Sequence, residues 1–158
     1  VELILSKKND SEKILIKNKI KNFREKLFMI LCINSFLSGS LEFSSNEKEL
    51  HSGFDNSQLK RKLNMLNHFN DNYMSLKRGQ TTLITINDGH FFINKYKGEI
   101  ILLCLNYSDS KQQYNLDLSK YDISVGLSLL DRSMIKVSDN IAQINLSSYQ
   151  TKIFNLKR

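Results

Sequence analysis

The chain has 158 residues, of which 41% are hydrophobic and 25% are charged, and its formal net charge is +7 at pH 7. These proportions exclude wholesale disorder, and the length suits one ordinary domain or two small ones. The longest apolar run, Leu27–Ile33, is far shorter than the ~20 residues with which a helix crosses a bilayer, so we expect no membrane partner.

The first part of the chain predicts a strand, a helix and a second strand. Val1–Leu5 is an apolar run with room for one strand, and Leu41–Phe43 has the minimal length of another. Between them, apolar residues spaced by three and four predict a helix that ends near Asn34–Gly39, where Asn, Ser and Gly gather. Asp10 or Ser11 suits the cap at its start. The predicted apolar face consists of Ile16, Ile20, Phe23, Leu27 and Ile30.

A second helix is predicted after a polar loop at Ser44–Ser57. Asp55, Asn56 or Ser57 suits its cap, and Gly79 would stop it. Its apolar stripe, again at helical spacing, consists of Leu59, Leu63, Leu66, Phe69, Tyr73 and Leu76.

After Gly79 the hydrophobic period changes from that of a helix to that of strands. Asn87–Gly89 and Lys97–Gly98 are turn signals, and Glu99–Tyr107 is almost wholly apolar, which predicts a central strand covered on both faces. Short strands at such spacing are typical of an antiparallel β-sandwich. We therefore predict two domains, residues 1–78 and residues 79–158. The predicted strands are Thr82–Ile86, His90–Tyr96, Glu99–Tyr107, Gln113–Leu118, Leu127–Leu130, Met134–Val137, Ile141–Leu146 and Thr151–Leu156.

The sequence contains no pattern typical of a metal or cofactor site. His51, His68 and His90 lie far apart without metal-ligand spacing, and the six glycines form no phosphate-binding loop. Cys32 and Cys104 each lie in an apolar run, which predicts two buried thiols in a reducing compartment. We therefore expect no metal, no cofactor and a cytoplasmic location.

Basic residues concentrate at Lys7–Lys26 and again at Lys60–Lys62. Patches of this kind can bind phosphate backbones. However, no aromatic side chains are interleaved with these lysines as a stacking platform, and the solvated face of a helix accounts for them. We therefore do not expect nucleic acid to be the main partner.

The order of the predicted elements resembles the C-terminal end of the α-amylase family of glycoside hydrolases, in which the last units of a (β/α)8 barrel precede an antiparallel β-sandwich. Ile20–Phe43 is similar to the seventh barrel helix, a tight turn and the eighth strand. The turn would be Leu37–Leu41, although the family's two flanking prolines are absent. Phe43–Glu47 and His51–Asp55 resemble segments that follow the eighth strand, but the first has lost its glycine.

The second half carries further similarities to that family. Tyr73–Arg78 resembles the end of the eighth barrel helix, and Ile101–Ser108 resembles the family's strand that ends in Asn, a hydrophobic or aromatic residue, and Ser. Ile144–Phe154 is similar to its closing strand. The resemblance implies a fold of the last β/α units of a TIM barrel followed by a β-sandwich. It also implies an α-glucan or oligosaccharide and the remainder of the barrel as partners.

The resemblance places one candidate catalytic residue in this chain, at Asp10. Lys8–Lys13 corresponds to the family's last barrel motif, whose aspartate binds sugar hydroxyls and stabilises the transition state. Asn9 replaces the family's His and Lys13 replaces its Arg, and a role of Asp10 as a helix cap remains open. The nucleophile and the acid/base of the family lie on earlier strands that this sequence lacks, so we expect no hydrolysis by this segment alone.

Several interpretations therefore remain. The chain is a segment of an active glycosidase or glucanotransferase, the product of a broken reading frame, or a non-catalytic carbohydrate-binding β-sandwich module. A basic nucleic-acid-binding domain is a separate alternative.

Overall fold

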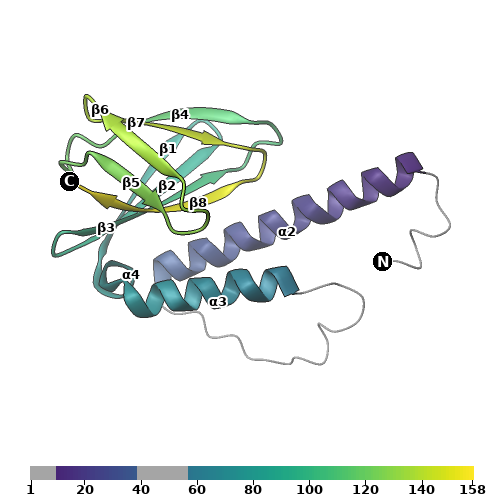
Figure 1. Ribbon diagram of the computed structural model, residues 1–158, viewed down its shortest axis with the longest axis horizontal. Helices are drawn as coiled ribbons and strands as arrows, with labels where there is room; N and C mark the ends of the chain where they lie inside the picture. Colours follow the sequence, from purple (N-terminus) through teal and green to yellow (C-terminus); the bar gives the residue numbers. More distant parts are fainter. Residues whose placement is uncertain (1–9, 39–56) are drawn as a thin grey trace.

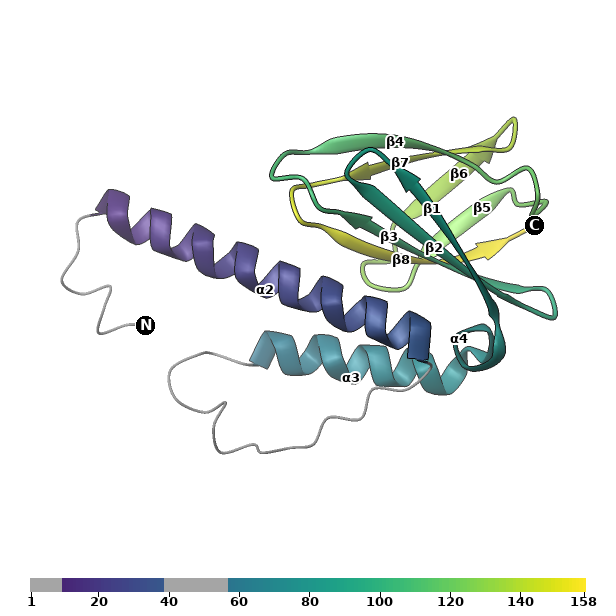
Figure 2. The same cartoon turned by 180° about the vertical axis from the view of Figure 1, so that it is seen from behind.

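The computed structural model of the protein describes residues 10–38 and 57–158. Two long helices lie side by side beneath a β-sheet, and a short third helix leads into the first strand (Figures 1 and 2). The predicted strands Val1–Leu5 and Leu41–Phe43 lie outside the described residues, so the β/α units of a barrel are not shown. The helices are α2 (Asp10–Ser38), α3 (Ser57–Asn72) and α4 (Met74–Arg78).

The rest of the described chain forms eight strands in one antiparallel sheet, in the order β1-β2-β3-β8-β5-β6-β7-β4. The sheet curls over on itself like a barrel, so that β4 and β7 lie on the side away from the helices (Figure 1). This architecture agrees with the predicted antiparallel sandwich. The strands are β1 (Gln80–Ile86), β2 (Gly89–Tyr96), β3 (Glu99–Asn106), β4 (Gln112–Asp117), β5 (Val125–Ser128), β6 (Met134–Ser138), β7 (Ile141–Leu146) and β8 (Thr151–Lys157).

β3 is buried on both of its faces, as the sequence predicts. Alternate side chains of a strand point to opposite faces of the sheet. Leu102 lies in the core enclosed by the curled sheet, together with Ile144 of β7 and Phe154 of β8. Leu103, its neighbour in sequence, lies in a second apolar cluster that the sheet shares with the helices.

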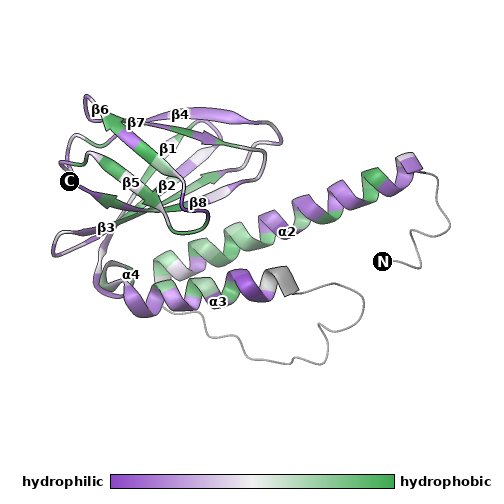
Figure 3. Ribbon diagram, viewed as in Figure 1, coloured by the Kyte–Doolittle hydropathy of each residue, from purple (hydrophilic) through white to green (hydrophobic). Residues whose placement is uncertain are grey.

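This second cluster joins the helical part of the chain to the sandwich. Phe28 and Phe36 of α2 and Leu66 of α3 are buried there with Leu103 and Ile153 from the outer face of the sheet. Figure 3 shows that the half of α2 beside α3 is the more hydrophobic half, whereas the other half is mainly polar. The sandwich also encloses an apolar cluster of its own. One cluster is thus shared by the two predicted domains and the other is not, and the division at residue 78 stays a prediction.

The buried face of α2 differs from the predicted one. Phe23 and Ile30 belong to the predicted apolar face, yet they are exposed, and the residues in contact with the rest of the protein are Phe28, Cys32 and Phe36. Leu27, also from the predicted face, does pack against the second cluster, and Ile16 and Ile20 are half-buried. The prediction was wrong at Ile30 because Leu27–Ile33 is apolar on every side of the helix, and a periodicity argument selects no face within such a run. No helix among the described residues has both the length and the apolar character that crossing a membrane requires.

The predicted second helix is broken near its end. Tyr73 adopts an extended backbone conformation, with φ −110° and ψ 110°, between α3 and α4. The backbone N–H of Ser75, in the first turn of α4, donates to the Glu99 carboxylate at 2.6 Å. An acceptor from β3 therefore satisfies a donor that a helix start leaves free, and this anchors α4 to the sheet.

Candidate functional site

Asp10, the candidate catalytic residue, lies in the first turn of α2, at the end of the helix that projects away from the sheet (Figures 1 and 2). Its carboxylate accepts from Lys13 Nζ at 3.2 Å, and its side chain is 94% exposed. Residues 1–9, which would adjoin it in the predicted barrel motif, lie outside the described residues. Its role at a sugar therefore stays a prediction.

A row of exposed apolar side chains follows α2 on the side away from its buried face. Phe23, Ile30 and Leu37 are 61%, 54% and 62% exposed. Residues seven apart lie on almost the same side of a helix, because two turns contain about 7.2 residues. We call these three residues the α2 outer stripe. A row of apolar side chains along one side of a helix, opposite its buried face, is a candidate interaction surface.

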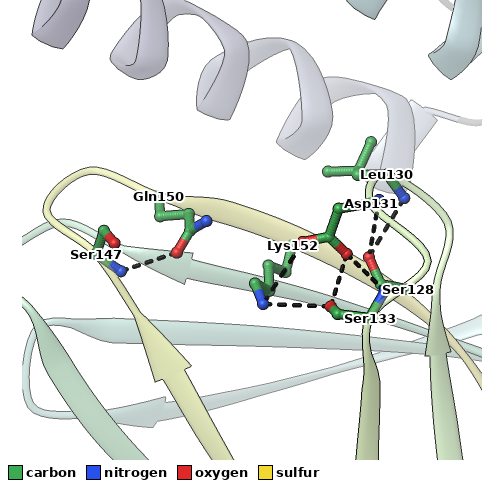
Figure 4. Close-up of polar contacts among 7 residues, drawn as sticks. All are labelled: Ser128, Leu130, Asp131, Ser133, Ser147, Gln150 and Lys152. Carbon is green, nitrogen blue, oxygen red and sulfur yellow. Dashed lines mark hydrogen bonds and ion pairs between the residues drawn. The ribbon is translucent and has the colours of Figure 1, made fainter.

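A polar network lies where the β5–β6 loop meets β8, close to α2 (Figure 4). Asp131 Oδ1 accepts from the hydroxyl of Ser133 at 2.6 Å and from its backbone N–H at 3.0 Å. Lys152 Nζ, from β8, lies 3.7 Å from Asp131 Oδ2 and 3.4 Å from Ser133 Oγ. The Ser128 hydroxyl accepts from the backbone N–H of Asp131 at 3.3 Å.

The electrostatics of this network keep Asp131 ionised. Partial burial alone would raise its pKa, but hydrogen bonds from Ser128 and Ser133 and the nearby Lys152 charge outweigh that effect and lower the pKa to about 2. Asp131 is therefore a permanent anion near neutral pH and holds Lys152 in place.

Beside this network, α2, α3 and two sandwich loops border a hollow of about 430 Å³. Its carboxylates are Asp131 and Glu25, and Glu25 Oε1 lies 2.9 Å from Lys62 Nζ, from α3. The same ammonium lies 4.5 Å from the centre of the Phe28 ring, and Lys26 Nζ lies 4.2 Å from that of Tyr149. These basic side chains therefore connect α2 to α3 and to the β7–β8 loop.

Asn106 is a polar residue whose role sequence reasoning did not identify, although it lies in the segment Ile101–Ser108 that carries the family resemblance. Its side chain is fully buried and makes four hydrogen bonds. Nδ2 donates to the carbonyls of Ser110 and Ser147, while Oδ1 accepts from the backbone N–H of Ser108 and from the Tyr114 hydroxyl at 2.8 Å. Asn106 thus joins the β3–β4 loop, the β7–β8 loop and β4.

The cysteines and histidines of the described chain do not gather into a site. Cys32 and Cys104 are both buried, as predicted, but in different clusters, and burial raises the pKa of both thiols. His68 is exposed, and His90 lies against the Tyr107 ring with 4.9 Å between ring centres. Within residues 10–38 and 57–158, no group of three or more His, Cys, Asp or Glu side chains could hold a metal ion.

No model of a known protein family matches the chain, and no curated protein matches it. Solved structures do. A putative α-galactosidase from Bacteroides fragilis matches with a TM-score of 0.62 and 18% identity, covering 85% of this chain and 29% of the other. AmyP in complex with maltotriose matches with a TM-score of 0.61 and 16% identity, covering 68% of this chain and 22% of AmyP. The α-amylase from Anoxybacillus matches with a TM-score of 0.59 and 20% identity, covering 67% and 24%.

The chain shares its fold with part of α-amylase-family glycoside hydrolases. This confirms, at the level of fold, the resemblance to the C-terminal end of that family. The chain spans between 22% and 29% of the length of the three structures.

Proposed function

We propose that this chain is the C-terminal part of an α-amylase-like glycoside hydrolase or glucanotransferase that acts on α-glucosidic bonds. The fold shared with AmyP and with the Anoxybacillus α-amylase carries the proposal. The maltotriose in the AmyP structure supports an α-glucan as the substrate class. Because the match covers less than a quarter of each of these two proteins, most of the catalytic domain would precede this segment.

The segment itself serves to stabilise that domain and does not cleave sugars alone. Retaining cleavage needs two carboxyl groups about 5–5.5 Å apart, one of which holds a proton as the general acid. Glu25 and Asp131 line one hollow, but Asp131 has a pKa of about 2 and Glu25 is paired with Lys62. Asp131 therefore does not supply the acid. In the complete protein, Asp10 is the candidate that would stabilise the transition state.

The α2 outer stripe is the surface that the remainder of the barrel would cover. Phe23, Ile30 and Leu37 face away from the second apolar cluster, which α2 shares with the sheet. In a barrel, neighbouring helices bury apolar side chains of this kind between them. The stripe therefore accounts for the predicted barrel partner in physical terms.

The test compares this chain with the full-length polypeptide from the same gene. We expect the full-length protein to hydrolyse maltotriose and the 158-residue chain to leave it intact. Ile30→Asp should lower the free energy of unfolding of the full-length protein by about 2 kcal/mol or more, because it buries a charge. In the isolated chain, where Ile30 is exposed, the same change should cost less than about 0.5 kcal/mol.

Asn18→Asp is the matched control, since Asn18 is an exposed neutral residue on another side of α2. It should have little effect in either protein. Equal effects of Ile30→Asp in the two proteins would refute coverage of the stripe, and a full-length protein inert toward α-glucans would refute the proposed activity.

A further inference from the structure

β6 and β7 separate from each other after a short hairpin. They pair only at Val137 with Ala142 and at Ser138 with Ile141. Beyond these positions β6 pairs with β5, on one side of the sandwich, and β7 pairs with β4, on the other. The separation opens a cleft of about 580 Å³ between the two strands. This volume lies in the usual range for small-molecule sites, about 300–1,000 Å³.

One wall of the cleft presents unpaired backbone groups of β6. Val137 N–H donates to the carbonyl of Ser124, on the β5 side, at 2.9 Å. Backbone groups of successive residues in a strand point to opposite sides. The N–H and C=O groups of Met134 and Lys136 therefore point away from β5 and toward β7, where no strand pairs with them.

The opposite wall presents the same kind of groups from β7. Leu118 N–H donates to the carbonyl of Asn140 at 2.8 Å, so the even-numbered residues of this segment face β4. By the same alternation, the N–H and C=O groups of Gln143 and Asn145 face β6 across the cleft. Two residues on each wall thus offer a donor and an acceptor toward the same space.

Neutral amide side chains add to these backbone groups. Gln143 and Asn145 of β7 and Asn115 of β4 line the cleft and are exposed. Asn115 lies directly opposite Gln143 in the strand register. A side-chain amide carries both a donor and an acceptor, so these three residues extend the alternating pattern outward.

The wide end of the cleft is bordered by the network of Figure 4, and its floor is apolar. Lys152 Nζ lies 3.4 Å from Ser133 Oγ and 3.7 Å from Asp131 Oδ2, so its charge is already compensated. Ile144 and Phe154 form part of the lining from the core side. The cleft therefore offers hydrogen bonds from both walls, and the exposed ammonium of Lys136, which also lines it, adds further donors.

We propose that this cleft is a second, non-catalytic carbohydrate-binding site that takes a short neutral oligosaccharide. Sugar hydroxyls both donate and accept, which matches the mixed groups on the two walls. A peptide strand inserted between the two walls would have to lie ~4.8 Å from each of them. The cleft closes where Ser138 pairs with Ile141 and leaves no such clearance at that end, so we do not propose a peptide strand as the ligand. The choice of an α-glucan as the sugar rests on the proposed function.

The test is a titration of the ¹⁵N-labelled 158-residue chain with maltotriose, followed by NMR. We expect saturable shifts at the backbone amides of Met134, Lys136, Gln143 and Asn145. Gln143→Ala should raise the Kd about three- to tenfold, the effect of losing one or two hydrogen bonds. Asn67→Ala, at an exposed amide on α3, is the matched control and should leave the Kd unchanged.

The reference amides are those of Ile135 and Val137, which face β5 and should shift much less than their neighbours. Absence of saturable shifts up to on the order of 10 mM maltotriose would overturn the site. Shifts confined to another surface would also overturn it, and so would an equal rise of the Kd in Asn67→Ala. The same holds if an extended neutral peptide competes with maltotriose and reverses the amide shifts. Such a failure leaves cleavage of maltotriose by the full-length protein unaffected, so the two proposals are refuted separately.

Discussion

Two adjacent leucines in β3 allow a direct test of how the sheet is covered. Leu102 and Leu103 are both fully buried, but Leu102 faces the enclosed core and Leu103 faces the helices. Burial of a leucine side chain contributes about 1.5–3 kcal/mol, and truncation to alanine adds the cost of a cavity. We therefore expect Leu102→Ala and Leu103→Ala each to lower the free energy of unfolding by about 3 kcal/mol.

The two variants should differ in where the structure loosens. Urea denaturation followed by circular dichroism gives the free energy of unfolding, and hydrogen exchange gives the local effect. Leu103→Ala should speed exchange in the C-terminal half of α2 and in α3, whereas Leu102→Ala should speed it in β4 and β7. A cost below about 1 kcal/mol for Leu103→Ala would refute the claim that the helices cover β3. Two separate unfolding transitions would support the predicted division into residues 1–78 and 79–158.

Three further predictions concern close packing and polar contacts. Gly89→Ala should cost about 1–3 kcal/mol in urea denaturation, because the added Cβ would lie 2.5 Å from the ring of Tyr114, which is held by its hydrogen bond to Asn106. Asn106→Ala should cost about 2–4 kcal/mol and speed exchange in the β3–β4 and β7–β8 loops, because it leaves buried groups unpaired. Asp131→Asn should lower stability at pH 7 by about 1 kcal/mol, a figure reduced because the carboxylate is half exposed. The folded-state pKa of Asp131 is about 2 and its ordinary value is 3.8, so this contribution is complete above about pH 4 and disappears as the pH falls through 2. Measuring both proteins at pH 7 and pH 2 checks the sign, and a gap that widens in acid would contradict it.

Much of the sandwich follows from the sequence, because β4 and β7 alternate cleanly between buried and exposed residues and β3 is almost wholly apolar. Ile141–Leu146 was predicted with the bounds that β7 has, and Glu99–Tyr107 ends one residue beyond β3. In β7 every second side chain is buried, which is the period that defines a strand. The predicted turn at Lys97–Gly98 is also observed, with positive φ at both residues.

The helical half was less predictable, because neighbours distant in sequence decide its details. The face of α2 that is buried depends on where the sheet lies, and an apolar run such as Leu27–Ile33 fits either choice. The break at Tyr73 depends on the Glu99 carboxylate, which comes from a strand later in the chain. Local periodicity contains neither piece of information.

The polar sites were harder still to predict from the sequence. Asn106 occurs in a segment that resembles the family, but its four partners come from three separate parts of the sandwich. Asp131 and Lys152 are brought together only by the pairing of β5 with β8. The cleft between β6 and β7 depends on strand pairing that ends early, and no residue pattern in the hairpin marks that position.

The size and activity of the polypeptide that contains this sequence in its source cells test the central claim most directly. Antibodies against the sandwich should isolate that polypeptide, and peptide mapping with a maltotriose hydrolysis assay should characterise it. We expect one chain several times heavier than 18.4 kDa that includes these residues at its C-terminal end and cleaves maltotriose. A free chain of 158 residues, or a larger one with no action on α-glucosidic bonds, would contradict it.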